Sequence, residues 1–185
     1  PAVTEDNRPK LRSLVDGCHE QKVNLLLYMS RQFADNAPEW ELYHEDVLQT
    51  PNFGAYSRKP DQRAYVVCWQ SHWREFCLSH LGKLMDEFGN DGWYLDGPEW
   101  PMACDNRHHG CGYEAPDGTL RPTWDIFGTR EFMKRLYVLT RQRKPEGQLN
   151  IHNSTVMTIP TLAWGTSTWG GEQIDAIKPP VKTLD

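Results

Sequence analysis

The sequence has no run of basic residues, no long apolar segment and no signal peptide. Its 185 residues include 20 Lys and Arg against 25 Asp and Glu, which gives a formal net charge of -5. Without a basic cluster, we expect neither nucleic acid nor an anionic membrane surface as a partner. No stretch approaches the roughly 20 apolar residues that a membrane-spanning helix needs. The sequence starts at Pro1 rather than Met, which indicates a mature or excised segment.

Motifs for nucleotide chemistry and for serine hydrolases are missing as well. There is no Walker-type loop, no GxGxxG and no Ser-His-Asp elbow, so no cofactor is expected. The five cysteines, at positions 18, 68, 77, 104 and 111, include no repeated Cys-x-x-Cys pair. Such a set is typical neither of a disulfide-dense scaffold nor of a zinc ribbon.

Aromatic residues, by contrast, are abundant. The chain contains 8 Trp, 7 Tyr and 6 Phe, although only 38% of its residues are hydrophobic. Polar chains rich in Trp often place some indole rings outside the core, where a flat amphipathic surface can stack on a ligand.

Hydrophobic patterning predicts alternating strands and helices. Short apolar runs predict strands over 23–28, 91–97, 148–152 and 162–169, with a further strand-like run at 64–69. Apolar residues at three- and four-residue steps predict a helix with Ser71 as N-cap and Gly89 as its stop, and a second helix with Thr123 as N-cap and Trp124 and Phe127 on its inner face. The segment 31–61 is expected to be a long, irregular, aromatic loop.

The alternation of strands and helices favours right-handed β-α-β units and a parallel sheet. Each long loop follows the C-terminal end of a strand, as in (β/α) barrels, where the chemistry lies in those loops. Because a whole barrel needs about 250 residues, we expect a partial TIM barrel of four to five βα units, with an open parallel α/β sheet as the alternative. Residues 1–185 would form a single barrel-like catalytic segment, with 1–20 as an N-terminal arm.

Carboxylates occupy two of the expected strand ends. Asp96 closes the strand at 91–97, and Glu172 follows the last predicted strand. Hydrolysis of a glycosidic bond needs one protonated and one ionised carboxyl group. Asp96 is the candidate ionised carboxylate and Glu172 the candidate acid, while Glu99, in the adjacent loop, is a third catalytic candidate. Either strand-end carboxylate could instead cap a loop or pair with an arginine.

Several polar and aromatic side chains are candidates for binding a sugar. His152 and Asn153 end the strand at 148–152, where they could hydrogen-bond to sugar hydroxyls. Indole rings can stack on the apolar faces of pyranose rings. The tryptophans expected in or beside the C-terminal opening of the predicted barrel are Trp40, Trp100, Trp164 and Trp169. Some of them are expected to pack the loops together instead.

Cys104 and Cys111 bracket the densest cluster of reactive side chains, CDNRHHGC. A disulfide between them is the first interpretation if the protein is exported. A tetrahedral zinc site is the alternative, but Cys-x6-Cys is an unusual zinc spacing and adjacent histidines rarely bind one ion, so no metal is assigned. His108 or His109 is a further candidate for binding a substrate hydroxyl. The other three cysteines are interpreted as small buried hydrophobes.

The ordered series DGWYLDG, CDNRHHGCGY, RPTWDIFGTREFMKRLY, LNIHNS and WGTSTWGGEQ lies within 91–173 and belongs to a resemblance that covers about 66–173. It resembles the central catalytic-barrel region of a bacterial glycoside-hydrolase-like family that is similar to glycoside hydrolase family 123. The resemblance implies a (β/α)8 barrel, usually flanked by β-sandwich domains, in exported proteins that degrade polysaccharides. Family 123 enzymes use an adjacent Asp-Glu pair to cleave 2-acetamido sugars. Because Asp96 is followed here by Gly97, only Asp96 is carried over, as an active-site carboxylate.

These features predict a secreted or periplasmic bacterial glycoside hydrolase that acts on a glycan or polysaccharide. The alternatives are a non-catalytic carbohydrate-binding barrel remnant and a metal-dependent hydrolase that uses the loop from Cys104 to Cys111. Flanking domains or missing barrel segments of a longer chain are the other expected partners.

Overall fold

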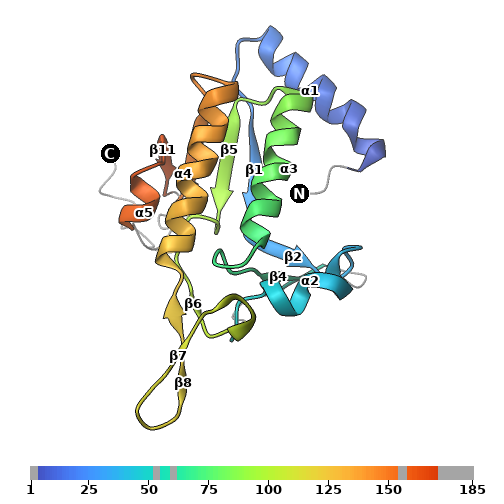
Figure 1. Cartoon of the computed structure of the whole chain (residues 1–185). Coiled ribbons are helices and arrows are strands. Elements are labelled where there is room, and N and C mark those ends of the chain that lie inside the picture. Colours follow the sequence, from blue (N-terminus) through green and yellow to red (C-terminus); the bar gives the residue numbers. More distant parts are fainter. Residues whose placement is uncertain (1–3, 52–54, 59–61, 154–157, 171–185) are drawn as a thin grey trace, which may run out of the picture.

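The centre of the molecule is a parallel sheet of four strands. The computed structural model describes residues 4–51, 55–58, 62–153 and 158–170. Within them the strands follow the order β1-β5-β10-β11, and every neighbouring pair is parallel. The strands are β1 (Leu26–Ser30), β5 (Gly92–Asp96), β10 (Gln148–His152) and β11 (Ser167–Trp169). This arrangement brings the C-terminal ends of all four strands to one edge of the sheet (Figure 1).

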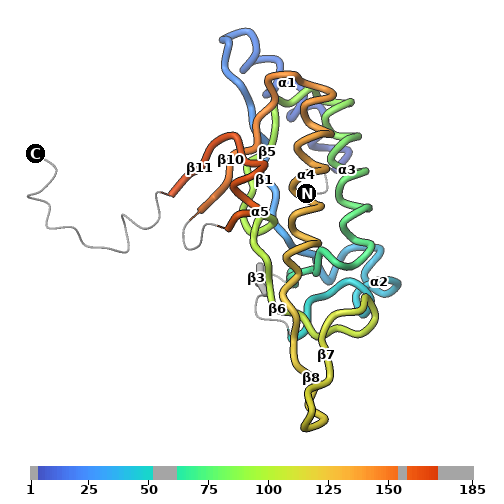
Figure 2. Tube along the Cα trace, turned by 60° about the vertical axis from the view of Figure 1, so that its left-hand side comes forward, coloured from blue at the N-terminus to red at the C-terminus, as the bar shows by residue number. Residues whose placement is uncertain are grey.

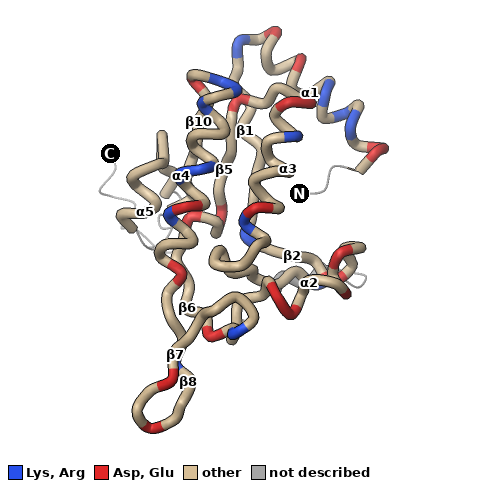
Figure 3. The backbone as a smooth tube through the Cα atoms, viewed as in Figure 1, with Lys and Arg blue, Asp and Glu red and all other residues tan. Residues whose placement is uncertain are grey.

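Two long helices cover one face of this sheet (Figures 1 and 2). α3 (Trp73–Phe88) precedes β5, and α4 (Ile126–Arg143) connects β5 to β10. Ion pairs join the two helices, and Figure 3 colours the Lys, Arg, Asp and Glu positions along the backbone. Arg143 binds Asp86 through two nitrogens at 2.7 and 2.9 Å, and Arg135 pairs with Glu75. The shorter helices are η1 (Glu5–Asn7), α1 (Arg8–Glu20), α2 (Trp40–Val47) and α5 (Ile159–Leu162).

The core lies between the sheet and these helices because side chains alternate along each strand. The strand residues Met29, Trp93, Leu95, Leu149 and Ile151 are at most 3% exposed and belong to one cluster with apolar residues of α3 and α4. The alternate positions, which face away from the helices, hold Tyr28, Tyr94, Asp96, Asn150 and His152. The face without helices is therefore polar and aromatic.

A second, antiparallel sheet occupies part of the segment 31–61. Its order is β2-β4-β3, with β2 (Gln32–Ala34), β3 (Ala55–Arg58) and β4 (Gln62–Val66). The prediction of an irregular loop was wrong because β2 pairs with a strand distant in sequence, Gln32 opposite Val66, and local composition does not show such a pairing. The strand-like run at 64–69 begins in this side sheet and not in the parallel one.

The segment between β5 and α4 contains short strands and a hairpin. β6 (Ala103–Cys104) pairs with β9 (Thr123–Trp124), η2 is Arg107–His109, and β7 (Tyr113–Glu114) pairs with β8 (Leu120–Arg121) in a hairpin that projects from the molecule (Figure 1). Because Trp124 belongs to β9, the helix has its N-cap at Asp125, two residues later than the predicted cap at Thr123. Trp124 and Phe127 are 63% and 73% exposed, so their predicted place in the core was wrong.

The predicted α/β class and parallel sheet are confirmed. α3 ends where expected, at Gly89, whose φ of +72° favours glycine. The residues expected as an N-terminal arm form η1 and α1, and Val15 of α1 is buried in the core. Within the described ranges, no helix combines the length and apolar character that crossing a bilayer requires.

Candidate active site

Asp96 lies at the C-terminal end of β5, where side chains of both neighbouring strands reach it. The Tyr28 hydroxyl on β1 donates to Asp96 Oδ2 at 2.7 Å. On the other side, His152 Nδ1 at the end of β10 lies 3.4 Å from Asp96 Oδ1 and 2.9 Å from the Tyr94 hydroxyl oxygen. The Asp96 side chain is 34% exposed, so its carboxylate is oriented by neighbours and still open to a ligand.

Aromatic rings surround this carboxylate. The Tyr94 ring is nearly parallel to the imidazole of His152, with centroids 5.9 Å apart, and Trp169 meets that imidazole edge-on at 4.7 Å. Trp169 and Tyr28 are 44% and 50% exposed, which leaves flat apolar surface beside Asp96. We call Tyr28, Tyr94, Asp96, His152 and Trp169 the Asp96 cluster. They meet because the four parallel strands end at the same edge of the sheet.

Glu99 lies close to the Asp96 cluster but is fully enclosed. Its exposure is 0%, and neither carboxyl oxygen has a hydrogen-bond partner within geometric limits among the described residues. Burial raises the pKa of Glu99 to about 8, and the negative charge of Asp96 adds to the shift, while nearby backbone N–H groups and Arg31 oppose it. Glu99 therefore keeps its proton at neutral pH.

A buried ion pair ties β1 to the segment that follows β5. The Arg31 guanidinium donates to the carbonyls of Val67, at 2.6 Å, and Trp100, and it pairs with Asp125. Asp125 in turn accepts a hydrogen bond from the backbone N–H of Met102 at 2.7 Å. Both charges are thus buried and compensated, and they fix the path of the chain just beyond Glu99.

An apolar cavity adjoins this segment. Its volume is about 480 Å³, and its lining is formed by Trp100, Pro101, Met102, Trp124, Ile126, Thr158 and Pro160. Trp100 is the one predicted sugar-binding residue in that lining. The exposed Trp124 and Ile126 belong to the same apolar surface.

Of the other predicted sugar-binding residues, three contact parts of the molecule outside the Asp96 cluster. Trp40 stacks on His44 in α2, and Trp164 packs against Tyr137 of α4. His108 lies 3.0 Å from a carboxylate oxygen of Asp46 on the surface. The backbone N–H of Asn153 donates to the carbonyl of Trp169 at 2.7 Å, so this residue joins the ends of β10 and β11. Glu172 lies outside the described residues.

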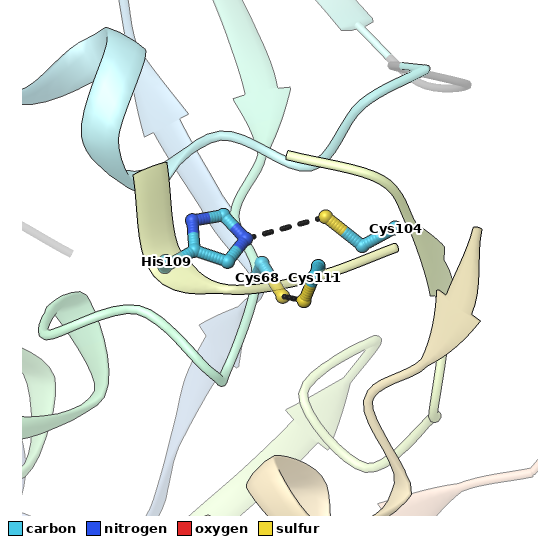
Figure 4. A group of neighbouring side chains, drawn as sticks. All are labelled: Cys68, Cys104, His109 and Cys111. Carbon is cyan, nitrogen blue, oxygen red and sulfur yellow. Dashed lines mark hydrogen bonds between the residues drawn. The ribbon is translucent and has the colours of Figure 1, made fainter. Parts of the chain in front are cut away.

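Cys68, Cys104, His109 and Cys111 converge in a mostly buried group (Figure 4). The Sγ atoms of Cys68 and Cys111 are 3.7 Å apart, and Cys104 Sγ is 3.3 Å from His109 Nε2. Cys104 and Cys111 are free thiols in this structure, so the expected disulfide is not formed in it. A hydrogen bond from Cys68, and then one from His109, lower the pKa of the Cys104 thiol to about 4.

Sequence reasoning did not identify Tyr28, Tyr94 or Cys68 as site residues. Tyr94 precedes Asp96 by two positions in one strand, and this alternation is a signal that could have placed both on one face. Tyr28 could not be placed without the register of the parallel pair, in which Tyr28 lies opposite Tyr94. Cys68 is distant in sequence from its partners and lies within the apolar run 64–69, where a cysteine reads as one more small hydrophobic residue.

Comparison with solved structures identifies the fold. No family model and no curated protein matches the chain. A cycloisomaltooligosaccharide glucanotransferase of Paenibacillus sp., complexed with cycloisomaltoheptaose, matches with a TM-score of 0.54 at 13% identity, over 78% of this chain and 20% of that one. An α-galactosidase of Thermus thermophilus in complex with stachyose gives 0.54 at 14% identity, over 85% and 30%. A family GH36 α-galactosidase of Geobacillus stearothermophilus gives 0.53 at 14%, over 89% and 22%.

The chain shares the fold of these solved structures over most of its length. With its wholly parallel sheet and its one layer of helices, the structure is consistent with the predicted partial (β/α) barrel. The chain spans less than a third of the length of each of these three structures. In a (β/α) barrel, the C-terminal edge of the sheet, where the Asp96 cluster lies, is the edge that holds active sites.

Proposed function

We propose that this chain is the part of a glycoside hydrolase that provides the catalytic carboxylate, Asp96. The observation that supports the proposal is the Asp96 cluster: an oriented, partly exposed carboxylate flanked by exposed aromatic rings. Its position at the C-terminal edge of a parallel sheet is the second support. The same proposal includes similarity to family 123, export of the protein, and flanking segments that complete the barrel.

Asp96 is proposed to act in its ionised form. Its negative charge would stabilise, or its oxygen attack, the sugar carbon that becomes positively charged as the glycosidic bond breaks. The hydrogen bond from Tyr28 holds Oδ2, which aims the other oxygen toward the side of His152. Trp169 would stack on the apolar face of a sugar ring, and His152 would hydrogen-bond to a hydroxyl.

Glu99 is proposed as the proton donor in preference to Glu172. A donor must hold its proton at neutral pH, and the pKa of Glu99, raised to about 8 by burial, meets that requirement. Because the carboxyl group is enclosed, this role requires that the site open locally when the substrate binds. The charge of Asp96 would help to retain the proton until that point.

Substitution of Asp96 tests the proposal. Asp96→Asn keeps the shape of the side chain and removes the charge, so hydrolysis should fall by at least about a thousandfold. Turnover is measured on a panel of aryl glycosides and soluble polysaccharides, and binding is measured by calorimetry. The matched control is Asp117→Asn on the exposed hairpin, which should keep full activity. Unchanged turnover in Asp96→Asn would overturn the assignment, and sugar binding without turnover by the unsubstituted protein would favour the carbohydrate-binding alternative.

The proton donor is tested through the leaving group. Aryl glycosides with very acidic leaving groups need no protonation, so Glu99→Gln should hydrolyse them well while losing most activity on alkyl glycosides and polysaccharides. Glu172→Gln should lose little on either class. If instead Glu172→Gln loses activity on alkyl glycosides and polysaccharides while Glu99→Gln does not, Glu172 is the proton donor.

A further inference from the structure

Three sulfurs and one imidazole nitrogen meet with the spacing of a metal site. The ligand atoms of Cys68, Cys104, His109 and Cys111 all lie within 4.8 Å of one another (Figure 4). Tetrahedral zinc, with Zn–S of about 2.3 Å and Zn–N of about 2.0–2.1 Å, places two sulfurs about 3.8 Å apart and a sulfur and nitrogen about 3.6 Å apart. The observed distances are 3.7 Å between Cys68 and Cys111 sulfurs and 3.3 Å between Cys104 Sγ and His109 Nε2. An ion placed between the four ligand atoms would require only small shifts of their side chains.

His109 is oriented as a metal ligand. Its Nδ1 lies 2.8 Å from the backbone carbonyl oxygen of Asp46, and a carbonyl only accepts, so Nδ1 holds the proton and donates it. Nε2, which faces Cys104, is then the nitrogen that would bind the ion, in the neutral form of the imidazole. A histidine that binds a metal commonly donates its other N–H to a carbonyl or carboxylate in this way.

Each sulfur also has a neighbouring donor that would hydrogen-bond to it in the metal-bound form. Thiolates are the form in which cysteine binds zinc. The donors are the backbone N–H groups of Thr50 and Asn106 for Cys104, the backbone N–H of Gln70 for Cys68, and the Thr123 hydroxyl for Cys111. Asp125, 3.6 Å from Cys68 Sγ, is already paired with Arg31, so its charge is compensated.

We propose that these four side chains bind one Zn²⁺ ion as a structural Cys3His site. A disulfide would use two of the cysteines and leave a buried third cysteine and the oriented His109 without a role. The three cysteines are at most 2% exposed, and four protein ligands fill a tetrahedron, so no position is left for a reactive water. This site therefore differs from the metal-dependent hydrolase considered as an alternative, and it does not depend on the proposed function.

The ion would join three segments that are distant in sequence. Cys68 follows β4, Cys104 and Cys111 belong to the segment between β5 and α4, and His109 is bonded to the C-terminal part of α2 through Asp46. The sequence spacing, Cys-x4-His-x-Cys with a distant fourth ligand, explains why no zinc motif is recognisable in the chain. The segment between β5 and α4 has little regular secondary structure, and the bound ion would stabilise its conformation instead.

Metal analysis of the purified protein tests the proposal. Protein prepared without chelators should contain about one zinc per chain, measured by inductively coupled plasma mass spectrometry. The variants Cys104→Ser and His109→Ala should lose most of this zinc. The control, Cys77→Ser on α3, should keep it. His109→Cys offers a fourth thiolate in the same place and should also keep the metal, which separates loss of a ligand from loss of folding. Protein loaded with Co²⁺ instead should show the thiolate charge-transfer and strong visible bands of a tetrahedral site.

Two results would overturn the proposal. One is folded protein that takes up neither zinc nor cobalt while all five thiols react with an alkylating agent after denaturation. The other is a disulfide between any two of the three cysteines, found by peptide mass mapping without reduction. A strong zinc chelator should lower the Tm by at least about 5 °C if the site is structural, and an unchanged Tm would contradict that role.

Discussion

At the scale of single residues, Asp96 and Glu99 show how two nearby carboxyl groups acquire different properties. Asp96 is partly exposed and accepts a hydrogen bond from Tyr28, which suits the ionised form. Glu99 is enclosed and has no comparable donor, which suits the protonated form. The two residues are only three positions apart, but Asp96 ends a strand and Glu99 lies in the turn that follows it, where its side chain is buried.

Glu99 should make the stability of the fold depend on pH. Its pKa is about 8 in the folded chain against an ordinary value of 4.5, so between these values the unfolded chain loses the proton and the folded chain keeps it. The contribution of Glu99 to the free energy of unfolding should therefore be largest below 4.5, fall by up to about 1.4 kcal/mol per pH unit, and level off above 8. Glu99→Gln should remove this slope.

The measurement is urea unfolding at about pH 5, 6.5 and 8, with the wild type and Glu99→Gln compared at each pH. The exposed Glu114→Gln serves as the control and should keep the wild-type slope. Parallel curves for the wild type and Glu99→Gln would show that the carboxyl is ionised at neutral pH.

At the scale of elements, close backbone contact between β5 and β10 depends on Gly92. A Cβ atom there would lie 1.9 Å from the carbonyl oxygen of Gln148, and the φ of +146° is itself unfavourable for other residues. Gly92→Ala should lower the free energy of unfolding by at least about 3 kcal/mol. Gly17→Ala in α1 meets no atom within 4 Å and should raise it by about 0.5–1 kcal/mol. Chemical denaturation of both variants checks the contrast, and equal effects would contradict it.

The elements predicted best were those with their own local pattern. The strands at 91–97 and 148–152 and the helix ending at Gly89 were found because apolar spacing and a stop signal lie within each segment. β2 and α2 were missed because their packing is decided by partners far along the chain. Trp124 and Phe127 fit a helical spacing, yet the core face of α4 is formed by Phe132, Met133 and Leu136.

The same distinction holds for the candidate site. Asp96, His152 and Trp169 were placed at strand ends by sequence alone, and the structure brings these three together. Tyr28 required the register of a parallel pair, and Cys68 required the folding of the long segment between β5 and α4. The positions of Tyr28 and Cys68 cannot be derived from the spacing of residues along the sequence. Both depend on which distant segments become neighbours in the fold.

At the scale of the whole molecule, the four-stranded sheet has two central and two outer strands. β5 and β10 pair on both sides, whereas β1 and β11 pair on one side within the described residues. Backbone amides of β5 and β10 should therefore exchange with deuterium most slowly, and those of β1 and β11 faster. Peptide-level hydrogen exchange by mass spectrometry measures this order. Slow exchange in β1 or β11 equal to that of β5 would mean that a further strand pairs there.

The tip of the hairpin formed by β7 and β8 projects from the molecule (Figure 1). The tip is closed by its own bonds, with Ala115 N–H donating to the Thr119 carbonyl at 2.9 Å and Asp117 accepting from the Thr119 hydroxyl at 2.6 Å. Residues can therefore be added or removed at the tip without moving Cys104 or Asp96. The hairpin is the part of this fold most free to change length during evolution, and new contacts with long or branched ligands can arise there at little risk to the rest.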